Sequence, residues 1–200
     1  VSLQRYLVTI LGRQNHAGTT PMDMRQDALY AASLLVAAVH DAAVPGDQVA
    51  TVGYLTVTPN AANIVPGQVD LTIALRDLSL ETVETMVNAL QKRVQEIEAA
   101  TGTQIQLERQ HAVEPTLASP NIQETIATVC DSVDLSHYSM PRRAIHDAQE
   151  IGRFTQMGMI FVPSQAGVSH AEDEYTSPEQ CGQGADVLLN TLLHLDRHLL

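Results

Sequence analysis

The chain has 200 residues, of which 44% are hydrophobic, enough to bury a core in one domain or two small ones. Its formal net charge of −12, with no run of Lys or Arg, argues against nucleic acid or an anionic membrane as a partner. No apolar stretch approaches the roughly 18 residues of a membrane-spanning helix, and the first residues resemble a strand rather than a signal peptide. Cys130 and Cys181 are far apart and each falls in an apolar helical pattern. We therefore expect a cytoplasmic protein without a disulfide framework.

The first part of the chain alternates strand and helix patterns. Alternation of polar and apolar residues predicts strands over residues 4–11, 49–57, 69–75 and 103–107. An Ala-rich helix is predicted over residues 25–42. An apolar stripe over residues 80–97 predicts a second helix, with Ser79 as its N-cap and Gly102 at its C-terminal stop. The order strand-helix-strand-strand-helix-strand is typical of a ferredoxin-like sandwich.

A connector at residues 115–120 leads into a segment with a different pattern. Helices are predicted near residues 120–134 and 147–156, a short apolar strand at 159–162, and a final helix that begins at Ser177-Pro178. One face of this last helix carries Cys181, Ala185, Leu188, Leu192 and Leu195. A continuous apolar strand needs neighbours on both edges, and here only one strand is predicted. The αβα segment therefore resembles a piece of a larger domain.

Four short segments carry polar residues in positions suited to chemistry. They are the loop Asn15-His16-Ala17-Gly18-Thr19-Thr20-Pro21-Met22, the turn containing Asn63-Ile64-Val65-Pro66-Gly67, the strand end Arg76-Asp77, and the stretch 160–170 that ends in Ser169-His170. Taken singly, each has an ordinary structural explanation. A loop histidine such as His16 is more often a turn residue, Asn63 can cap its turn, and Arg76 can pair with an acid. His170 follows a predicted buried strand, where open α/β sheets bind ligands.

Together with the segment His146-Asp147-Ala148-Gln149, these motifs appear in the order and at the spacings of a known family. The chain resembles the C-terminal half of the zinc-dependent hydantoinase/carbamoylase family, which includes N-carbamoyl-L-amino-acid hydrolases, allantoate amidohydrolases and β-ureidopropionases. The resemblance covers essentially all 200 residues. It implies a fold of class α/β with an α+β lid: residues 1–115 form a ferredoxin-like lid that also dimerises, and residues 116–200 return into a metallopeptidase-like catalytic domain.

The resemblance also implies a role for each candidate residue. His16 matches a lid histidine that polarises the scissile carbonyl, commonly in the partner subunit's active site, and is the catalytic candidate. Asn63, Arg76 and His146 match substrate-binding positions, and the guanidinium fork of Arg76 suits a carboxylate. His170 matches a metal ligand in a site of two divalent ions, zinc or manganese. The implied reaction is hydrolysis of a ureido or amide C–N bond in a small carbamoyl or ureido acid by metal-activated water, in a homodimer joined through the lid.

Two departures from the family pattern bear on the isolated chain. The family's upstream half supplies a His-x-Asp motif, an acidic bridging residue, a pair of adjacent glutamates and a further His, and we expect these to be missing here. Arg142, Arg143 and Ile145 stand where the family has small residues, which weakens the assignment of His146. We therefore expect the 200 residues alone to retain no metal and to show little or no turnover. The alternatives are a non-catalytic dimerisation module and a dipeptidase of the same wider metallopeptidase group.

Overall fold

The computed structural model describes residues 1–44, 46–141 and 144–199. The chain divides into two compact units, Val1–Pro115 (unit 1) and Thr116–Leu200 (unit 2), and each is described by itself. None of the helices in the described ranges combines the length and apolarity needed to cross a membrane.

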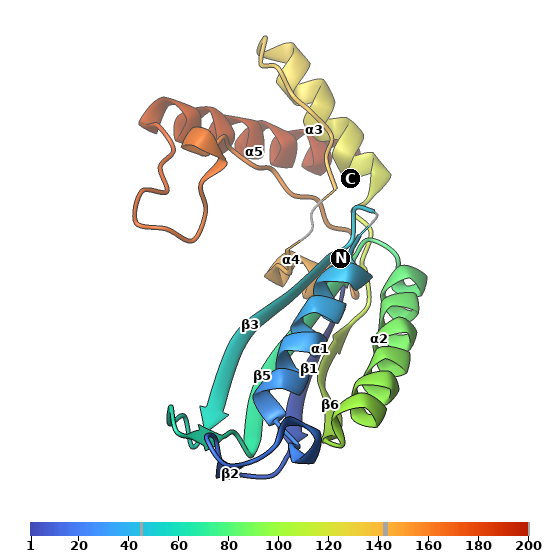
Figure 1. Cartoon of the computed structure of the whole chain (residues 1–200). Helices are drawn as coiled ribbons and strands as arrows, with labels where there is room; N and C mark the ends of the chain where they lie inside the picture. The colour runs from blue at the N-terminus through green and yellow to red at the C-terminus, as the bar shows by residue number, and fades with distance from the viewer. Residues whose placement is uncertain (45, 142–143, 200) are drawn as a thin grey trace. The chain divides into compact units, whose positions relative to one another are not determined.

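Unit 1 is a four-stranded antiparallel sheet with two helices on one face (Figure 1). In chain order its main elements are β1 (Ser2–Leu11), α1 (Ala28–Ala42), β3 (Val49–Thr58), β5 (Gln68–Asp77), α2 (Leu80–Thr101) and β6 (Gln104–Val113). The order across the sheet is β3-β5-β1-β6. Numbered along the chain, this is the second, third, first and fourth strand of a split βαβ sandwich, so the predicted ferredoxin-like fold is confirmed.

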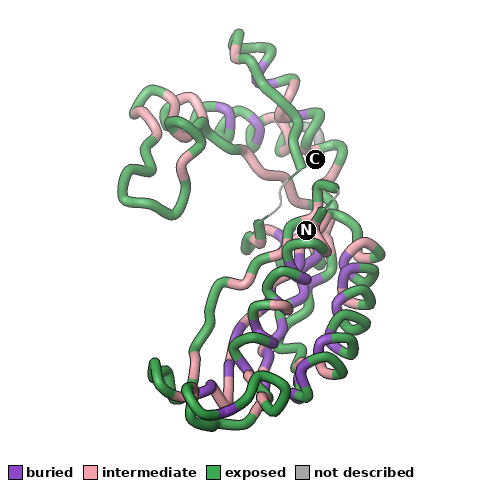
Figure 2. The backbone as a smooth tube through the Cα atoms, in the orientation of Figure 1, coloured by how far each residue is buried: buried purple, intermediate pink, exposed green. Residues whose placement is uncertain are grey.

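The core of unit 1 lies between the sheet and the two helices (Figure 2). Alternate residues of β1 and β5, including Val8 and Leu71, are fully buried, and residues three and four apart on α2, including Leu90 and Val94, face them. The predicted caps of α2 are present. Ser79 Oγ accepts from the Thr82 N–H at 3.4 Å, and Gly102 ends the helix at a left-handed φ of 66°.

A second, two-stranded sheet lies at one end of unit 1. Its strands are β2 (Asn15–His16) and β4 (Ile64–Val65), and the turn η1 (Met22–Met24) follows β2. β4 directly precedes β5, and the Gly12 N–H donates to the Gly67 carbonyl at 2.8 Å. The small sheet therefore belongs to the end of unit 1 where β5 begins, as Figure 1 shows.

The regular secondary structure in the described part of unit 2 is helical. It contains α3 (Pro120–Ser132), α4 (Asp147–Ile151), the turn η2 (Gln165–Gly167) and α5 (Pro178–Leu199). α3 packs on α5 around the buried side chains of Val129, Cys130 and Val187. Both cysteines are free thiols, as predicted: Cys130 is buried and Cys181 is exposed.

Three predictions for unit 2 are wrong in detail. Residues 159–162 form no strand, because a strand requires a hydrogen-bonded neighbour and the described part of unit 2 contains none. The helix predicted near residues 147–156 ends at Ile151. The apolar face predicted for α5 is uncovered within unit 2, with Leu188 51% and Leu192 56% exposed, while the neighbouring stripe with Val187 and Thr191 is buried. α3 covers only that neighbouring stripe within unit 2.

Candidate functional site

His16 and Asn63 lie together although they are distant in the sequence. His16 is paired with Ile64 in the small sheet, and the Ala17 N–H donates to the Asn63 carbonyl at 3.0 Å. Both residues are exposed. Two of the predicted site residues therefore share one end of unit 1.

The His16 ring is oriented by a backbone hydrogen bond. Its Nδ1 accepts from the Gly18 N–H at 3.0 Å. A neutral imidazole that accepts at Nδ1 carries its proton on Nε2. Because the side chain is exposed, the Nε2–H is available to donate to an oxygen of a bound molecule. Sequence reasoning identified His16 but not this contact of Gly18.

The loop that carries His16 is closed by further hydrogen bonds to its own carbonyls. Thr20 donates to the His16 carbonyl from its N–H at 3.1 Å and from its Oγ1 at 2.7 Å. Arg25 donates from Nε to the Thr20 carbonyl at 3.1 Å and from Nη2 to the Ala17 carbonyl at 2.6 Å. Thr20 stands in the motif that singled out His16, whereas Arg25 lies beyond its end and was missed.

Arg76 lies at the far end of β5 from His16 and Asn63. β5 begins at Gln68, beside the small sheet, and Arg76 pairs with Leu3 on one side and Val49 on the other. Eight residue steps at about 3.3 Å each separate Gln68 from Arg76 by about 26 Å. Arg76 is half-buried. The structure therefore does not bring Arg76 to the His16 cluster of the same chain.

Asp77 does not provide the pairing that an ordinary strand-end explanation of Arg76 invokes. Successive side chains of a strand point to opposite faces, so Arg76 and Asp77 diverge. The Asp77 carboxylate instead accepts from the Ser79 N–H at 2.8 Å, just before α2.

His146 and His170 are both exposed in unit 2. His146 is the N-cap of α4, where its Nδ1 accepts from the Ala148 N–H at 3.3 Å. The His170 backbone has a φ of 59°, and its N–H donates to Glu174 Oε2 at 2.7 Å. Ile145 is half-buried, whereas Arg142 and Arg143 lie outside the described residues.

A complete metal site is not formed by the described residues. Among residues 1–44, 46–141 and 144–197, no three His, Cys, Asp or Glu side chains gather closely enough to hold an ion. The expectation that the chain lacks a His-x-Asp triplet is wrong as to the letters, since His194-Leu195-Asp196 occurs within α5. Residues two apart on a helix do not face each other, so His194 and Asp196 are not placed to share one ion. His170 fits a single imidazole ligand, and no more than that.

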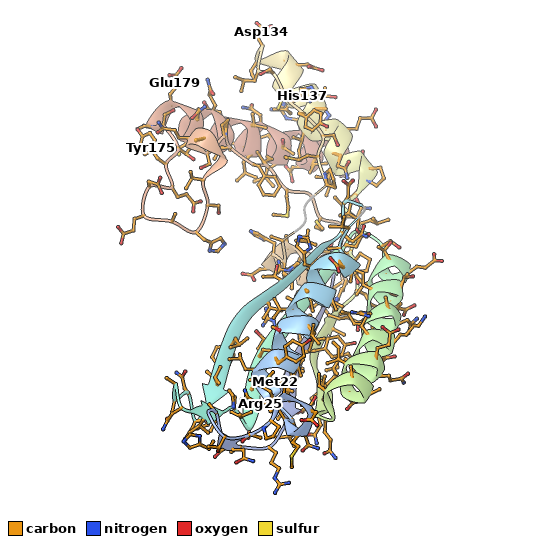
Figure 3. All side chains as sticks on the ribbon, in the orientation of Figure 1. Met22, Arg25, Asp134, His137, Tyr175 and Glu179 are labelled. Atoms are coloured by element: carbon orange, nitrogen blue, oxygen red, sulfur yellow. The ribbon has the colours of Figure 1, made fainter. Side chains whose placement is uncertain are left out.

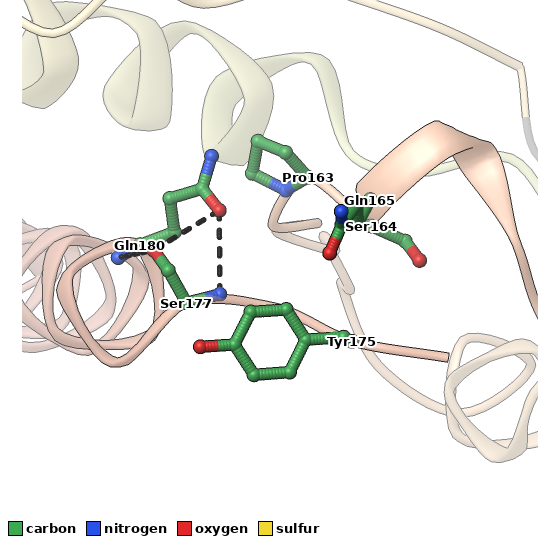
Figure 4. Close-up of a pocket in the computed structure, with 6 residues that line it drawn as sticks. All are labelled: Pro163, Ser164, Gln165, Tyr175, Ser177 and Gln180. Carbon is green, nitrogen blue, oxygen red and sulfur yellow. Dashed lines mark hydrogen bonds between the residues drawn. The ribbon is translucent and has the colours of Figure 1, made fainter. Parts of the chain in front are cut away.

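Sequence reasoning missed a hollow in unit 2 of about 310 Å³. Pro163, Ser164, Gln165, Tyr175, Ser177 and Gln180 line it (Figure 4). Ser177 Oγ accepts from the Gln180 N–H at 3.2 Å, and Gln180 Oε1 accepts from the Ser177 N–H at 3.4 Å, which is a capping box at the start of α5. This pair therefore has a structural role, and the lining contains no charged group to hold a carboxylate.

These features coincide with a family match. The model of peptidase family M20/M25/M40 matches residues 14–194, and the chain belongs to this family. Amidohydrolases of the family are generally metal-dependent.

Within the family the chain is similar to enzymes that act on carbamoyl and ureido compounds. It is 34% identical to an N-carbamoyl-L-amino-acid amidohydrolase of Paenarthrobacter aurescens, over 98% of this chain and 48% of that protein. It is 33% identical to an allantoate amidohydrolase of Bacillus subtilis, over 96% and 47%. The solved structure of a hydantoinase/carbamoylase family amidase from Burkholderia vietnamiensis superposes with a TM-score of 0.91 at 32% identity, over 96% of this chain and 47% of that one. The chain spans about half the length of the relatives it matches.

Proposed function

We propose that the chain forms the lid and the C-terminal part of the catalytic domain of a metal-dependent amidohydrolase. The complete enzyme hydrolyses the C–N bond of an N-carbamoyl amino acid or of a related ureido acid such as allantoate. The observation that carries the proposal is the exposed His16 ring, whose Nδ1 accepts from the Gly18 N–H. The names of the similar enzymes support the substrate class.

The proposed role of His16 is to donate a hydrogen bond from Nε2 to the scissile carbonyl oxygen. Negative charge grows on that oxygen only as the tetrahedral transition state forms, so a donor aimed there accelerates the chemical step. Such a donor contributes about 3–4 kcal/mol in comparable hydrolases. The Gly18 hydrogen bond supports this role because it occupies Nδ1 as an acceptor and so leaves the proton of the neutral ring on Nε2.

Asn63 and Arg76 are proposed to bind the substrate carboxylate from two copies of the chain. A small ureido acid cannot span about 26 Å, so it cannot touch His16 and Arg76 of one protomer at once. A site that uses both therefore takes one from each protomer, which supports a homodimer joined through unit 1. β3 is an edge strand with exposed Tyr54 and Leu55, and such an edge is suited to pairing with another chain.

His170 is proposed to be one ligand of a pair of divalent ions, zinc or manganese, whose other ligands lie outside these 200 residues. When bound, the ions supply the activated water that attacks the carbon. A neutral imidazole is a suitable ligand for either metal. His146 remains a candidate substrate contact, although its Nδ1 already caps α4 and only its Nε2 is left for substrate.

The proposal is tested with an enzyme that contains this chain together with the family's upstream half. Purified with Zn²⁺ or Mn²⁺, it should hydrolyse N-carbamoyl amino acids or allantoate and lose activity in a chelator. His16→Ala should lower kcat about 10²–10³-fold with little change in KM. His40→Ala removes an exposed histidine from α1 and is the matched control, expected to leave kcat unchanged.

The complete enzyme, measured beside the 200-residue chain alone, separates the proposal from the two alternatives. We expect it to be dimeric in sedimentation equilibrium and to show no turnover. If the complete enzyme is also inactive on every carbamoyl and ureido acid and binds no metal, the non-catalytic dimerisation module is the correct description. Hydrolysis of dipeptides in preference to ureido acids would favour the dipeptidase.

A further inference from the structure

Hydrogen-bond donors from three residues converge on the short loop that presents His16. The Gly18 N–H holds the ring at Nδ1, and Thr20 holds the His16 carbonyl through two hydrogen bonds. Arg25 then binds the carbonyls of Ala17 and Thr20, which stand on either side of Gly18. Figure 3 labels Arg25 beside Met22, at the end of unit 1 that carries β2.

The Arg25 contacts require a guanidinium. Its Nε and Nη2 donate to two carbonyls three residues apart, at 3.1 Å and 2.6 Å, and the residue is half-buried. Two N–H groups fixed in one plane can bridge these acceptors simultaneously. A lysine ammonium is a single point on a flexible stem, so it can satisfy one of the two carbonyls but holds the pair poorly.

We propose that Arg25 is a positioning residue for His16. Its guanidinium fixes the carbonyls of Ala17 and Thr20, and this sets the peptide whose N–H, at Gly18, orients the imidazole. Arg25 itself does not touch the substrate. The inference rests on the proposed function only for its kinetic consequence, because the ordering of the loop can be measured without turnover.

The first test measures amide hydrogen exchange in the 200-residue chain by NMR. Arg25→Ala should accelerate exchange at Gly18 and Thr20 about tenfold, while amides of the α2 core such as Leu90 stay protected. In Arg25→Lys, the exchange rates at Gly18 and Thr20 should lie between those of the unsubstituted chain and those of Arg25→Ala. Arg13→Ala is the matched control: it removes an exposed arginine from the same end of unit 1 and leaves the backbone contact of Arg13 with Gln26 intact, so it should change neither amide.

The second test measures kinetics in the complete enzyme. Arg25→Ala should lower kcat about tenfold or more with little change in KM, and millimolar guanidinium should restore part of the loss. Guanidinium should not restore His16→Ala. Rescue separates a missing side chain from a misfolded loop.

The outcomes distinguish the two proposals. If His16→Ala leaves kcat unchanged, the proposed function of His16 fails, whatever Arg25 does. If His16→Ala is impaired but Arg25→Ala keeps full kcat, or if Gly18 exchange is the same in Arg25→Ala and Arg13→Ala, the positioning role is overturned. Exchange that rises equally throughout α2 would show that Arg25 stabilises the whole unit and would also overturn it.

Discussion

The candidate role of His16 depends on neighbouring backbone groups, and the contribution of Gly18 can be tested directly by substitution. A Cβ added at Gly18 would lie 3.3 Å from Cε1 of His16, which is closer than ordinary van der Waals contact. We expect Gly18→Ala to tilt the ring and lower kcat of the complete enzyme about tenfold, because small misplacements of a catalytic donor are costly. Steady-state kinetics measure this. Gly182→Ala is the control, since a Cβ there meets nothing within 4 Å; equal kcat in both variants would contradict the expectation.

The candidate residues were predictable from the sequence to different degrees. His16 and Asn63 stand in recognisable motifs, and their proximity follows once residues 15–16 and 64–65 pair. The role proposed for Arg25 was not predictable, because it depends on which way the carbonyls of Ala17 and Thr20 point. The direction of a carbonyl within an irregular loop is not encoded by any periodic pattern in the sequence. The separation of Arg76 from His16 likewise could not be predicted from the motifs, because it depends on the register of the strands.

At the scale of elements, α1 begins directly after the His16 loop and is capped by Asp27. The Asp27 Oδ1 accepts from the N–H groups of Leu29 and Tyr30, at 2.9 Å and 3.1 Å. Asp27→Ala should lower the free energy of unfolding of unit 1 by about 1–2 kcal/mol, because two helix N–H groups lose their acceptor. Urea unfolding followed by circular dichroism measures it. Asp23→Ala, in η1, removes the same charge without a cap and should cost less; equal losses would refute the cap as the cause.

The elements of unit 1 were predictable because local and tertiary signals agree there. Ser79 and Gly102 mark α2, and alternation marks β1 and β5, whose buried side chains between Tyr6 and Ile10 and between Val69 and Leu75 form one core with the helices. In unit 2 the local sequence signal and the tertiary packing do not agree. Residues 159–162 have the composition of a buried strand but no partner among the described residues of the unit, so composition alone could not make them one.

At the scale of the whole molecule, the different reactivities expected of the two thiols provide a test of the packing of unit 2. Burial, and then the charge of Asp131, raise the pKa of the Cys130 thiol above its usual range, while Cys181 is exposed. The thiolate is the reactive form, so at pH 8 a smaller fraction of Cys130 is reactive. We expect an alkylating reagent to modify Cys181 first, with Cys130 slow until the pH passes the ordinary thiol range or the unit unfolds. Mass spectrometry of Cys181→Ser and Cys130→Ser variants measures each rate, and equal rates at pH 8 would contradict the burial of Cys130.

The proposed sharing of one site between two protomers predicts that defective copies complement each other. In a mixed dimer of His16→Ala and Arg76→Ala, one site combines an intact His16 from one copy with an intact Arg76 from the other, and the second site lacks both. Random exchange puts half the protomers into mixed dimers, so about a quarter of wild-type activity should return. The pair His16→Ala and Asn63→Ala is the matched control: both residues lie on one loop cluster of the same protomer, so no mixed site is complete and no activity should return. No recovery in the first pair, after mass spectrometry has shown mixed dimers, would mean that one protomer supplies both His16 and Arg76, and the distance of about 26 Å along β5 would then have to be closed by a different fold of unit 1. Recovery in the control would mean that His16 and Asn63 act from different protomers, which would contradict their pairing in one loop cluster.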